Sequence, residues 1–268
     1  MGERRVRVDV LLVDRGVFDS RAKASAAILA GDVQLKNGGR RINKPGQTVP
    51  DDIELIVAQR NRYVSRGGIK LENALEAFPE IDPAGRFALD AGASTGGFTD
   101  CLLQRGARHV IAIDVAYGEL HWKLREDERV TVIERMNVRE LKPDDLEYAP
   151  DLLVADLSFI ALEKVLPALR SVAAEHFDFL ALVKPQFEVG RGNVGKGGVV
   201  RDRESRTDAI EAAARSAVAI GFSVLGACSS GLPGPAGNLE AFLWLAEPSR
   251  PGLADLRAAA EGVEPEAR

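Results

Sequence analysis

A glycine-rich segment, DAGASTGGFTD at residues 90–100, follows the apolar run FAL at residues 87–89, which is typical of a buried strand. Glycines at a strand-to-helix turn let the backbone approach a ligand closely, and the following helix directs its first amide groups at that ligand. The segment therefore predicts an α/β domain that binds a small molecule at the end of its first strand.

Apolar runs and helical patterns alternate on the carboxyl side of this segment. Strands are expected at residues 87–93, 109–116, 130–136, 151–157, 177–184, 222–230 and 240–247, and helices near residues 65–78, 97–105, 161–173 and 203–220. Alternation of this kind predicts a mostly parallel sheet with helices on both faces, a Rossmann-like fold. The runs are too short to cross a bilayer.

The spacing of the glycines indicates which ligand the turn would bind. A dinucleotide-binding loop has the pattern G-x-G-x-x-G, whereas Ser94 stands here at the position of the middle glycine. The register D-x-G-x-S-x-G is closer to the loop of class I methyltransferases, which packs against S-adenosylmethionine. We therefore expect this cofactor, with a nicotinamide oxidoreductase as the alternative. The expected cofactor-binding residues of the loop are Asp90, Gly92, Ser94, Gly96 and Gly97.

Polar residues at the ends of the next two strands extend this cofactor site. Asp114 ends the second strand, where a carboxylate can accept hydrogen bonds from both ribose hydroxyls of either a nicotinamide nucleotide or S-adenosylmethionine. Asn137 follows the third strand, where its amide could meet an adenine edge or form a turn.

The first part of the chain differs from the rest in charge. Residues 1–70 carry a net charge of +6 and residues 71–268 carry −11, which indicates an anion-binding front module on an acidic body. A helix near Val8–Leu12, a second helix capped by Asp19 or Ser20 with Leu29 on its apolar side, a hairpin at Asn37-Gly38 and a strand at residues 51–57 are expected here. This pattern resembles the small α+β RNA-binding domain named after ribosomal small-subunit protein four. We expect that domain at residues 1–58, a linker at 59–64 and the methyltransferase domain at 65–268.

Four charged residues, Lys70, Asp156, Lys184 and Glu240, are candidates for a catalytic site. Asp156 and Lys184 follow two buried strands, and ligands of such sheets bind outside those strand ends. Each could be explained singly as a surface or turn residue. Their order, Lys-Asp-Lys-Glu interleaved with the glycine-rich loop, is that of the tetrad of RNA 2′-O-methyltransferases.

The whole chain from Arg5 to about Leu245 resembles the TlyA, or haemolysin A, family of ribosomal RNA cytidine 2′-O-methyltransferases. The resemblance is carried by VSRGGIK at residues 64–70, DAGASTGGFTD, ADLSFI at 155–160, VKPQFEVG at 183–190 and GNLE at 237–240. It implies transfer of a methyl group to a cytidine ribose, in both the small- and the large-subunit RNA. Lys184 would either take up the hydroxyl proton or orient the hydroxyl as a donor.

Further expectations concern partners and setting. Ribosomal RNA within ribosomal subunits is the expected partner, and the residues expected to contact it are Arg7, Arg21, Lys44, Arg66 and Arg139. The three histidines lack metal-ligand spacing, so no metal is expected, and the two cysteines lie in apolar stretches, which favours a reducing cytoplasm. A membrane-active haemolysin and a non-catalytic ribosome assembly factor are the alternative functions. Oligomeric state is left open.

Overall fold

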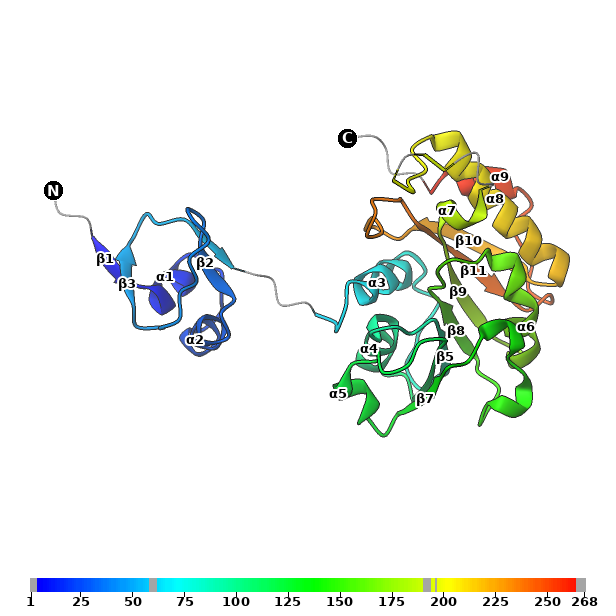
Figure 1. Cartoon of the computed structure of the whole chain (residues 1–268), viewed down its shortest axis with the longest axis horizontal. Helices are drawn as coiled ribbons and strands as arrows, with labels where there is room; N and C mark the ends of the chain where they lie inside the picture. Colours follow the sequence, from blue (N-terminus) through cyan, green and yellow to red (C-terminus); the bar gives the residue numbers. More distant parts are fainter. Residues whose placement is uncertain (1–3, 58–61, 190–193, 196, 264–268) are drawn as a thin grey trace. The chain divides into compact units, whose positions relative to one another are not determined.

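The structure is a computed structural model that describes residues 4–57, 62–189, 194–195 and 197–263 (Figure 1). Contacts between Cα atoms divide the chain into two compact units, Met1–Asn61 and Arg62–Arg268. We refer to them as the front unit and the catalytic unit and describe each by itself.

The front unit is a small α+β unit. Its elements are β1 (Arg5–Arg7), α1 (Val8–Asp14), α2 (Arg21–Leu29), β2 (Val33–Leu35), β3 (Thr48–Pro50) and β4 (Leu55–Val57). Strand β1 pairs with β3 and β2 pairs with β4, both antiparallel. The two helices pack over a core that includes Val8, Leu12, Ile28, Val33 and Val49.

The helix ends of the front unit follow from its sequence. Ser20 caps α2, because its hydroxyl accepts a hydrogen bond from the Lys23 amide at 3.3 Å. The tight hairpin expected at Asn37-Gly38 between two short strands is not formed: after the turn there is only an isolated bridge between Gln34 and Arg41, and β2 pairs with β4 instead. The expectation that Leu29 lies on the apolar side of α2 was wrong: its side chain is 70% exposed, because it lies at the last residue of the helix.

The catalytic unit has a seven-stranded sheet in the order β10-β11-β9-β8-β5-β6-β7. The strands are β5 (Phe87–Ala91), β6 (His109–Asp114), β7 (Val130–Glu134), β8 (Leu152–Ala155), β9 (Asp178–Val183), β10 (Ser223–Ser229) and β11 (Ala241–Ala246). Strand β11 runs antiparallel to both of its neighbours, β9 and β10, whereas the other paired strands of this sheet are parallel. The expected mostly parallel, Rossmann-like sheet is therefore confirmed.

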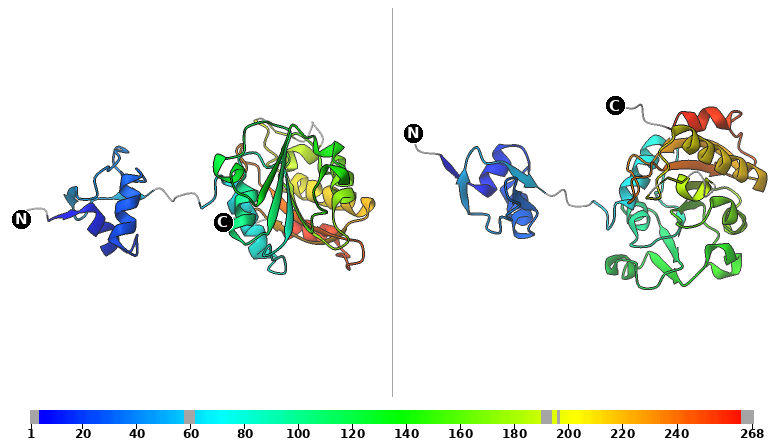
Figure 2. Two further views of the ribbon diagram at one scale, coloured as in Figure 1. Left: turned by 90° about the horizontal axis from the view of Figure 1, so that it is seen from below. Right: turned by 45° about the horizontal axis from the view of Figure 1, so that its top comes forward.

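Helices cover both faces of this sheet, as Figure 2 shows. One face packs against α3 (Gly67–Ala77), α4 (Gly97–Gln104) and α5 (Trp122–Arg125). The other packs against α6 (Leu166–Val172), α8 (Arg203–Ile220) and α9 (Leu256–Glu261). Burial on both faces explains why β8 and β9 read as continuous apolar runs. The remaining short helices are α7 (Pro185–Glu188) and 3₁₀ turns at Val138–Glu140, Pro143–Asp145 and Leu162–Lys164.

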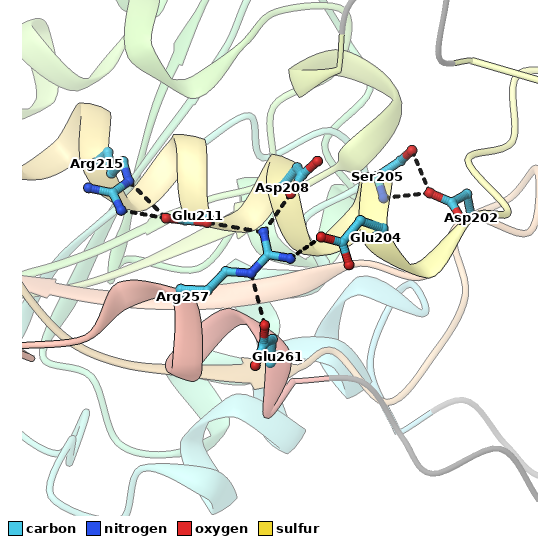
Figure 3. A network of polar contacts seen from close by, with 8 residues as sticks. All are labelled: Asp202, Glu204, Ser205, Asp208, Glu211, Arg215, Arg257 and Glu261. Atoms are coloured by element: carbon cyan, nitrogen blue, oxygen red, sulfur yellow. Dashed lines mark hydrogen bonds and ion pairs between the residues drawn. The ribbon is translucent and has the colours of Figure 1, made fainter.

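A cluster of charges fastens the last helix, α9, to α8 (Figure 3). Arg257 of α9 forms ion pairs with three acidic residues of α8, namely Asp208 at 2.5 Å, Glu211 at 3.2 Å and Glu204. Hydrogen bonds to Asp208, and then to Glu261 and Glu211, raise the pKa of the Arg257 guanidinium above its ordinary value.

Candidate active site

The glycine-rich loop between β5 and α4 needs several of its glycines. Gly92 and Gly96 have φ angles of +89° and +96°, which residues other than glycine rarely adopt. A Cβ atom on Gly92 would lie 2.7 Å from the backbone oxygen of Asp156, and one on Gly96 would overlap the Leu124 side chain. The loop therefore lies against the end of β8 on one side and α5 on the other.

Asp90, expected among the cofactor-binding residues, is turned into the protein. Its side chain is fully buried, and Oδ2 accepts hydrogen bonds from the Thr99 amide at 2.9 Å and the Thr99 hydroxyl at 2.6 Å. Burial raises the pKa of the Asp90 carboxyl to about 7. The described walls of both large cavities include neither Asp90 nor Gly96, so the structure gives these two residues contacts that shape the loop.

A cavity of about 1080 Å³ lies over the ends of β5, β6 and β7. Its described walls include Gly92, Ser94, Asp114 and Asn137. The Asp114 carboxylate accepts hydrogen bonds from the Ser94 amide at 2.7 Å and the Ala116 amide at 2.8 Å, which fixes it beside the loop. Two of the expected cofactor-binding residues, Ser94 of the loop and Asp114 at the end of β6, are thus hydrogen-bonded to each other.

Asn137 has the turn geometry that the sequence allowed. Its Oδ1 accepts a hydrogen bond from the Arg139 amide at 3.2 Å and caps the 3₁₀ turn Val138–Glu140. It lies in the wall of the 1080 Å³ cavity together with Arg139. The cap and a contact with a ligand are compatible, because the cap uses only the amide oxygen.

The four charged candidates line a neighbouring cavity of about 640 Å³. They form two ion pairs: Lys70 with Glu240, and Lys184 with Asp156, whose Nζ and Oδ1 atoms are 2.5 Å apart. The antiparallel β11 explains part of this arrangement. Ala241 pairs with Val183 in antiparallel register. Glu240, just before Ala241, and Lys184, just after Val183, therefore lie at the same edge of the sheet.

Burial differs between the two pairs. The Lys70 and Glu240 side chains are 8% and 1% exposed, whereas those of Lys184 and Asp156 are 11% and 24% exposed. A buried lysine or glutamate is rarely left unpaired, so each charge of the inner pair depends on the other. The outer pair is the one that a substrate in the cavity can reach more easily.

Several residues of the cavity walls were not predicted from the sequence. The Lys184 ammonium donates a hydrogen bond to the Ser158 hydroxyl at 2.8 Å, and Asn238 connects two loops by accepting from the Val200 amide and donating to the Gly198 carbonyl, both at 2.9 Å. Ser158 stands in ADLSFI and Asn238 in GNLE, so both lie in strings that the sequence singled out. The two cavities share a wall made of Gly92, Ser94, Asp156, Ser158, Phe159, Gln186 and Phe187.

The expected RNA-contacting residues are divided between the units. Arg66 lies in the wall of the 640 Å³ cavity and Arg139 in that of the larger one. In the front unit, Arg7 and Arg21 both bind the Asp9 carboxylate, and Lys44 is exposed in the turn before β3.

Two negative observations apply to the part of the chain that the structure describes. It contains no group of three or more histidine, cysteine, aspartate or glutamate side chains that could hold a metal ion. None of its helices is both long and apolar enough to cross a membrane.

Comparisons with known proteins agree with this geometry. A family model described as FtsJ-like methyltransferase matches residues 63–247. The 16S/23S rRNA (cytidine-2′-O)-methyltransferase TlyA of Mycobacterium tuberculosis is 52% identical over 244 residues, which are 90% of each chain. Hemolysin A of Brachyspira hyodysenteriae is 37% identical over 88% of this chain and 97% of its own.

A solved structure extends the likeness to nearly the whole chain. A protein described as a hemolysin from Streptococcus thermophilus has 39% sequence identity and a TM-score of 0.73, over 97% of this chain and 96% of that one. The sequence, the order of the charged residues and the fold lead to one assignment. The chain belongs to the FtsJ-like methyltransferases and, within them, to the TlyA, or haemolysin A, family of rRNA cytidine-2′-O-methyltransferases.

Proposed function

We propose that the protein transfers a methyl group from S-adenosylmethionine to the ribose 2′-hydroxyl of a cytidine in ribosomal RNA of both subunits, in the cytoplasm. The observation that carries the proposal is that two ion pairs, Lys70–Glu240 and Lys184–Asp156, line the 640 Å³ cavity. This cavity shares a wall with the 1080 Å³ cavity beside the glycine-rich loop. The M. tuberculosis relative, whose printed name covers 16S and 23S rRNA, supports the choice of substrate.

The residues around the 1080 Å³ cavity fit the cofactor. The position of a Gly92 side chain is taken by the Asp156 backbone, so only a glycine leaves the loop open here. The Asp114 carboxylate, fixed by two backbone amides, can accept hydrogen bonds from ribose hydroxyls, and the Asn137 side-chain amide can meet the adenine. When bound, S-adenosylmethionine supplies a methyl group on a positively charged sulfur.

Lys184 is proposed to bind and orient the substrate hydroxyl. A lysine ammonium has three donors, of which one goes to the Ser158 hydroxyl, while the Asp156 carboxylate lies beside the ammonium as its ion-pair partner. A remaining donor would bind the 2′-oxygen and stabilise the negative charge that develops there as the hydroxyl proton passes to solvent water and the new carbon–oxygen bond forms. This geometry favours the orienting role over the role of base.

The inner pair is proposed to hold this arrangement in place. Lys70 lies on α3 and Glu240 precedes β11, so their contact joins the helix before the sheet to the strand beside Lys184. Fixed charges around the reacting oxygen lower the reorganisation needed during transfer.

RNA capture is assigned to both units. We propose that the front unit is an RNA-binding domain of the ribosomal-protein-S-four type, with Arg7, Arg21 and Lys44 as phosphate contacts, and that Arg66 and Arg139 contact RNA at the two cavities. The cavities are recessed, so the target nucleotide must be displaced from its stack for the hydroxyl to reach them.

Methyl transfer to purified 30S and 50S subunits from cells that lack the enzyme tests the proposal. Labelled methyl from S-adenosylmethionine is expected on a ribose 2′-oxygen in both subunits. Lys184→Ala is expected to abolish transfer while cofactor binding, measured by calorimetry, is kept, and Lys142→Ala, at an exposed position, serves as the matched control. Absence of label from both subunits would instead favour an assembly factor, and loss of cofactor binding in Lys184→Ala would overturn the role given to this lysine.

A further inference from the structure

The front unit contains a buried carboxylate that binds two exposed arginines. Asp9, in the first turn of α1, is 1% exposed. Its Oδ1 accepts from Arg7 Nε and its Oδ2 from Arg7 Nη2, both at 2.9 Å, and Oδ2 also accepts from Arg21 Nη2 at 3.0 Å. One carboxylate therefore orders side chains from two separate elements, the end of β1 and the start of α2.

The same carboxylate stays charged well below neutral pH. Hydrogen bonds from Arg7, followed by those from Arg21, lower the pKa of Asp9 to about 2 despite its burial. A bidentate contact between a guanidinium and a carboxylate also fixes the plane of the guanidinium. The orientation of Arg7 is thus set by the protein before any ligand arrives.

The two arginines keep donors for a ligand. Their side chains are 49% and 59% exposed although their inner edges are bound to Asp9. A guanidinium has five N–H donors, of which Arg7 uses two and Arg21 one on this carboxylate. The outer edges of two neighbouring cations therefore face solvent together.

Asp9 also fastens the turn that bears Lys44. Its backbone amide donates to the Pro45 carbonyl at 3.2 Å, and the Arg7 guanidinium lies 3.3 Å from the position of a Cβ atom on Gly46. The turn and the arginine pair consequently form one surface of the front unit.

We propose that Asp9 is a positioning residue for RNA binding, which holds Arg7 and Arg21 as a preorganised pair for the phosphate groups of ribosomal RNA. The proposal rests on the function proposed above. It predicts that loss of Asp9 weakens RNA binding, which is the opposite of the usual effect, because loss of an acidic residue near a polyanion ordinarily strengthens binding. Here loss of the carboxylate frees two long side chains, whose ordering then opposes binding.

Two asparagine variants of the full chain separate these effects. Asp9→Asn and Asp19→Asn change the net charge equally, and Asp19 is an exposed acid in the segment just before α2. We expect Asp9→Asn to weaken binding to purified 50S subunits by about fivefold or more, with kcat for methyl transfer kept at saturating subunits. Asp19→Asn is expected to bind as tightly as the wild type or more tightly.

A third variant and the salt dependence guard against a merely structural explanation. Arg7→Lys keeps the charge but cannot make the bidentate contact, so it is expected to weaken binding as well. The slope of log K against log salt should stay the same in Asp9→Asn, since the number of cations is unchanged, whereas an unfolded front unit would lower it.

The outcomes distinguish this proposal from the function on which it rests. Wild-type binding together with equal or tighter binding by Asp9→Asn, or a lower salt slope in that variant, would overturn the role of Asp9 alone. A wild-type chain that binds neither 50S nor 30S subunits would overturn the proposed function itself.

Discussion

Replacing Lys70 by methionine should destabilise the catalytic unit as well as stop methyl transfer. The variant leaves Glu240, whose side chain is 1% exposed, without its cation. Removal of one partner from a buried ion pair costs about 3–5 kcal/mol. Both side chains border the 640 Å³ cavity, which water can enter, so we take the lower end, about 3 kcal/mol. For a unit of this size the loss corresponds to a fall of about 6–12 °C in Tm.

Urea unfolding followed by tryptophan fluorescence measures this loss. The chain has two tryptophans, Trp122 and Trp244, and both lie in the catalytic unit. Lys142→Met, at an exposed lysine of the same unit, is the matched control and should change the free energy of unfolding by less than about 0.5 kcal/mol.

The double variant Lys70→Met/Glu240→Leu is the decisive comparison. It removes both buried charges, and apolar replacement of a buried pair is often neutral, so the free energy of unfolding should return to within about 1 kcal/mol of the wild-type value. Methyl transfer should stay absent. A loss of less than about 1 kcal/mol in Lys70→Met, or a double variant no more stable than the single one, would refute the dependence of each charge on the other.

Three further predictions concern the loop, the buried acid and the last helix. Gly92→Ala should weaken S-adenosylmethionine binding by about tenfold or more in calorimetry, whereas Gly118→Ala, also at a positive φ but with open space around it, should not. The raised pKa of Asp90, about 7, means that the unfolded chain binds fewer protons than the folded one between about pH 4 and 7. The free energy of unfolding should therefore fall as the pH rises through that range. In urea titrations, the stability of Asp90→Asn relative to wild type should be greater at pH 8 than at pH 5. An equal difference at the two pH values would contradict this. Arg257→Ala should speed amide exchange in α9 without changing kcat, and high salt should speed the exchange of the wild type towards that of the variant; equal exchange in both at low salt would show that the ion pairs do not hold the helix.

The sheet and the proximity of Asp156 to Lys184 could be predicted because both depend on patterns that are visible in the sequence. Continuous apolar runs mark strands buried on both faces, and polar residues at the ends of such strands meet at one edge of the sheet. That logic brought Asp156 and Lys184 together correctly. It could not show that Lys70 pairs with Glu240, because this contact depends on the antiparallel insertion of β11 between β9 and β10.

The orientation of single side chains was beyond the sequence. The glycine-rich motif placed Asp90 beside the cofactor, but spacing does not distinguish a carboxylate that faces a ligand from one that binds the next helix through Thr99. Ser158 gave no signal of its own, since its contact with Lys184 requires two strand ends to be adjacent. Asp9 was hidden for a similar reason: it joins Arg7 to Arg21 across a turn between helices.

The antiparallel strand β11 also decides when the site comes into existence during synthesis. Among the residues that the structure describes it is the last strand, yet it lies inside the sheet, and Glu240, just before it, is 170 residues away from Lys70 in the sequence. A nascent chain that ends before β11 carries the glycine-rich loop, Asp156 and Lys184 but has Lys70 unpaired and β9 at an open edge. A ribosome that translates this message would therefore release a complete enzyme late, and a prematurely terminated product would carry no complete site with which to modify the ribosomes around it.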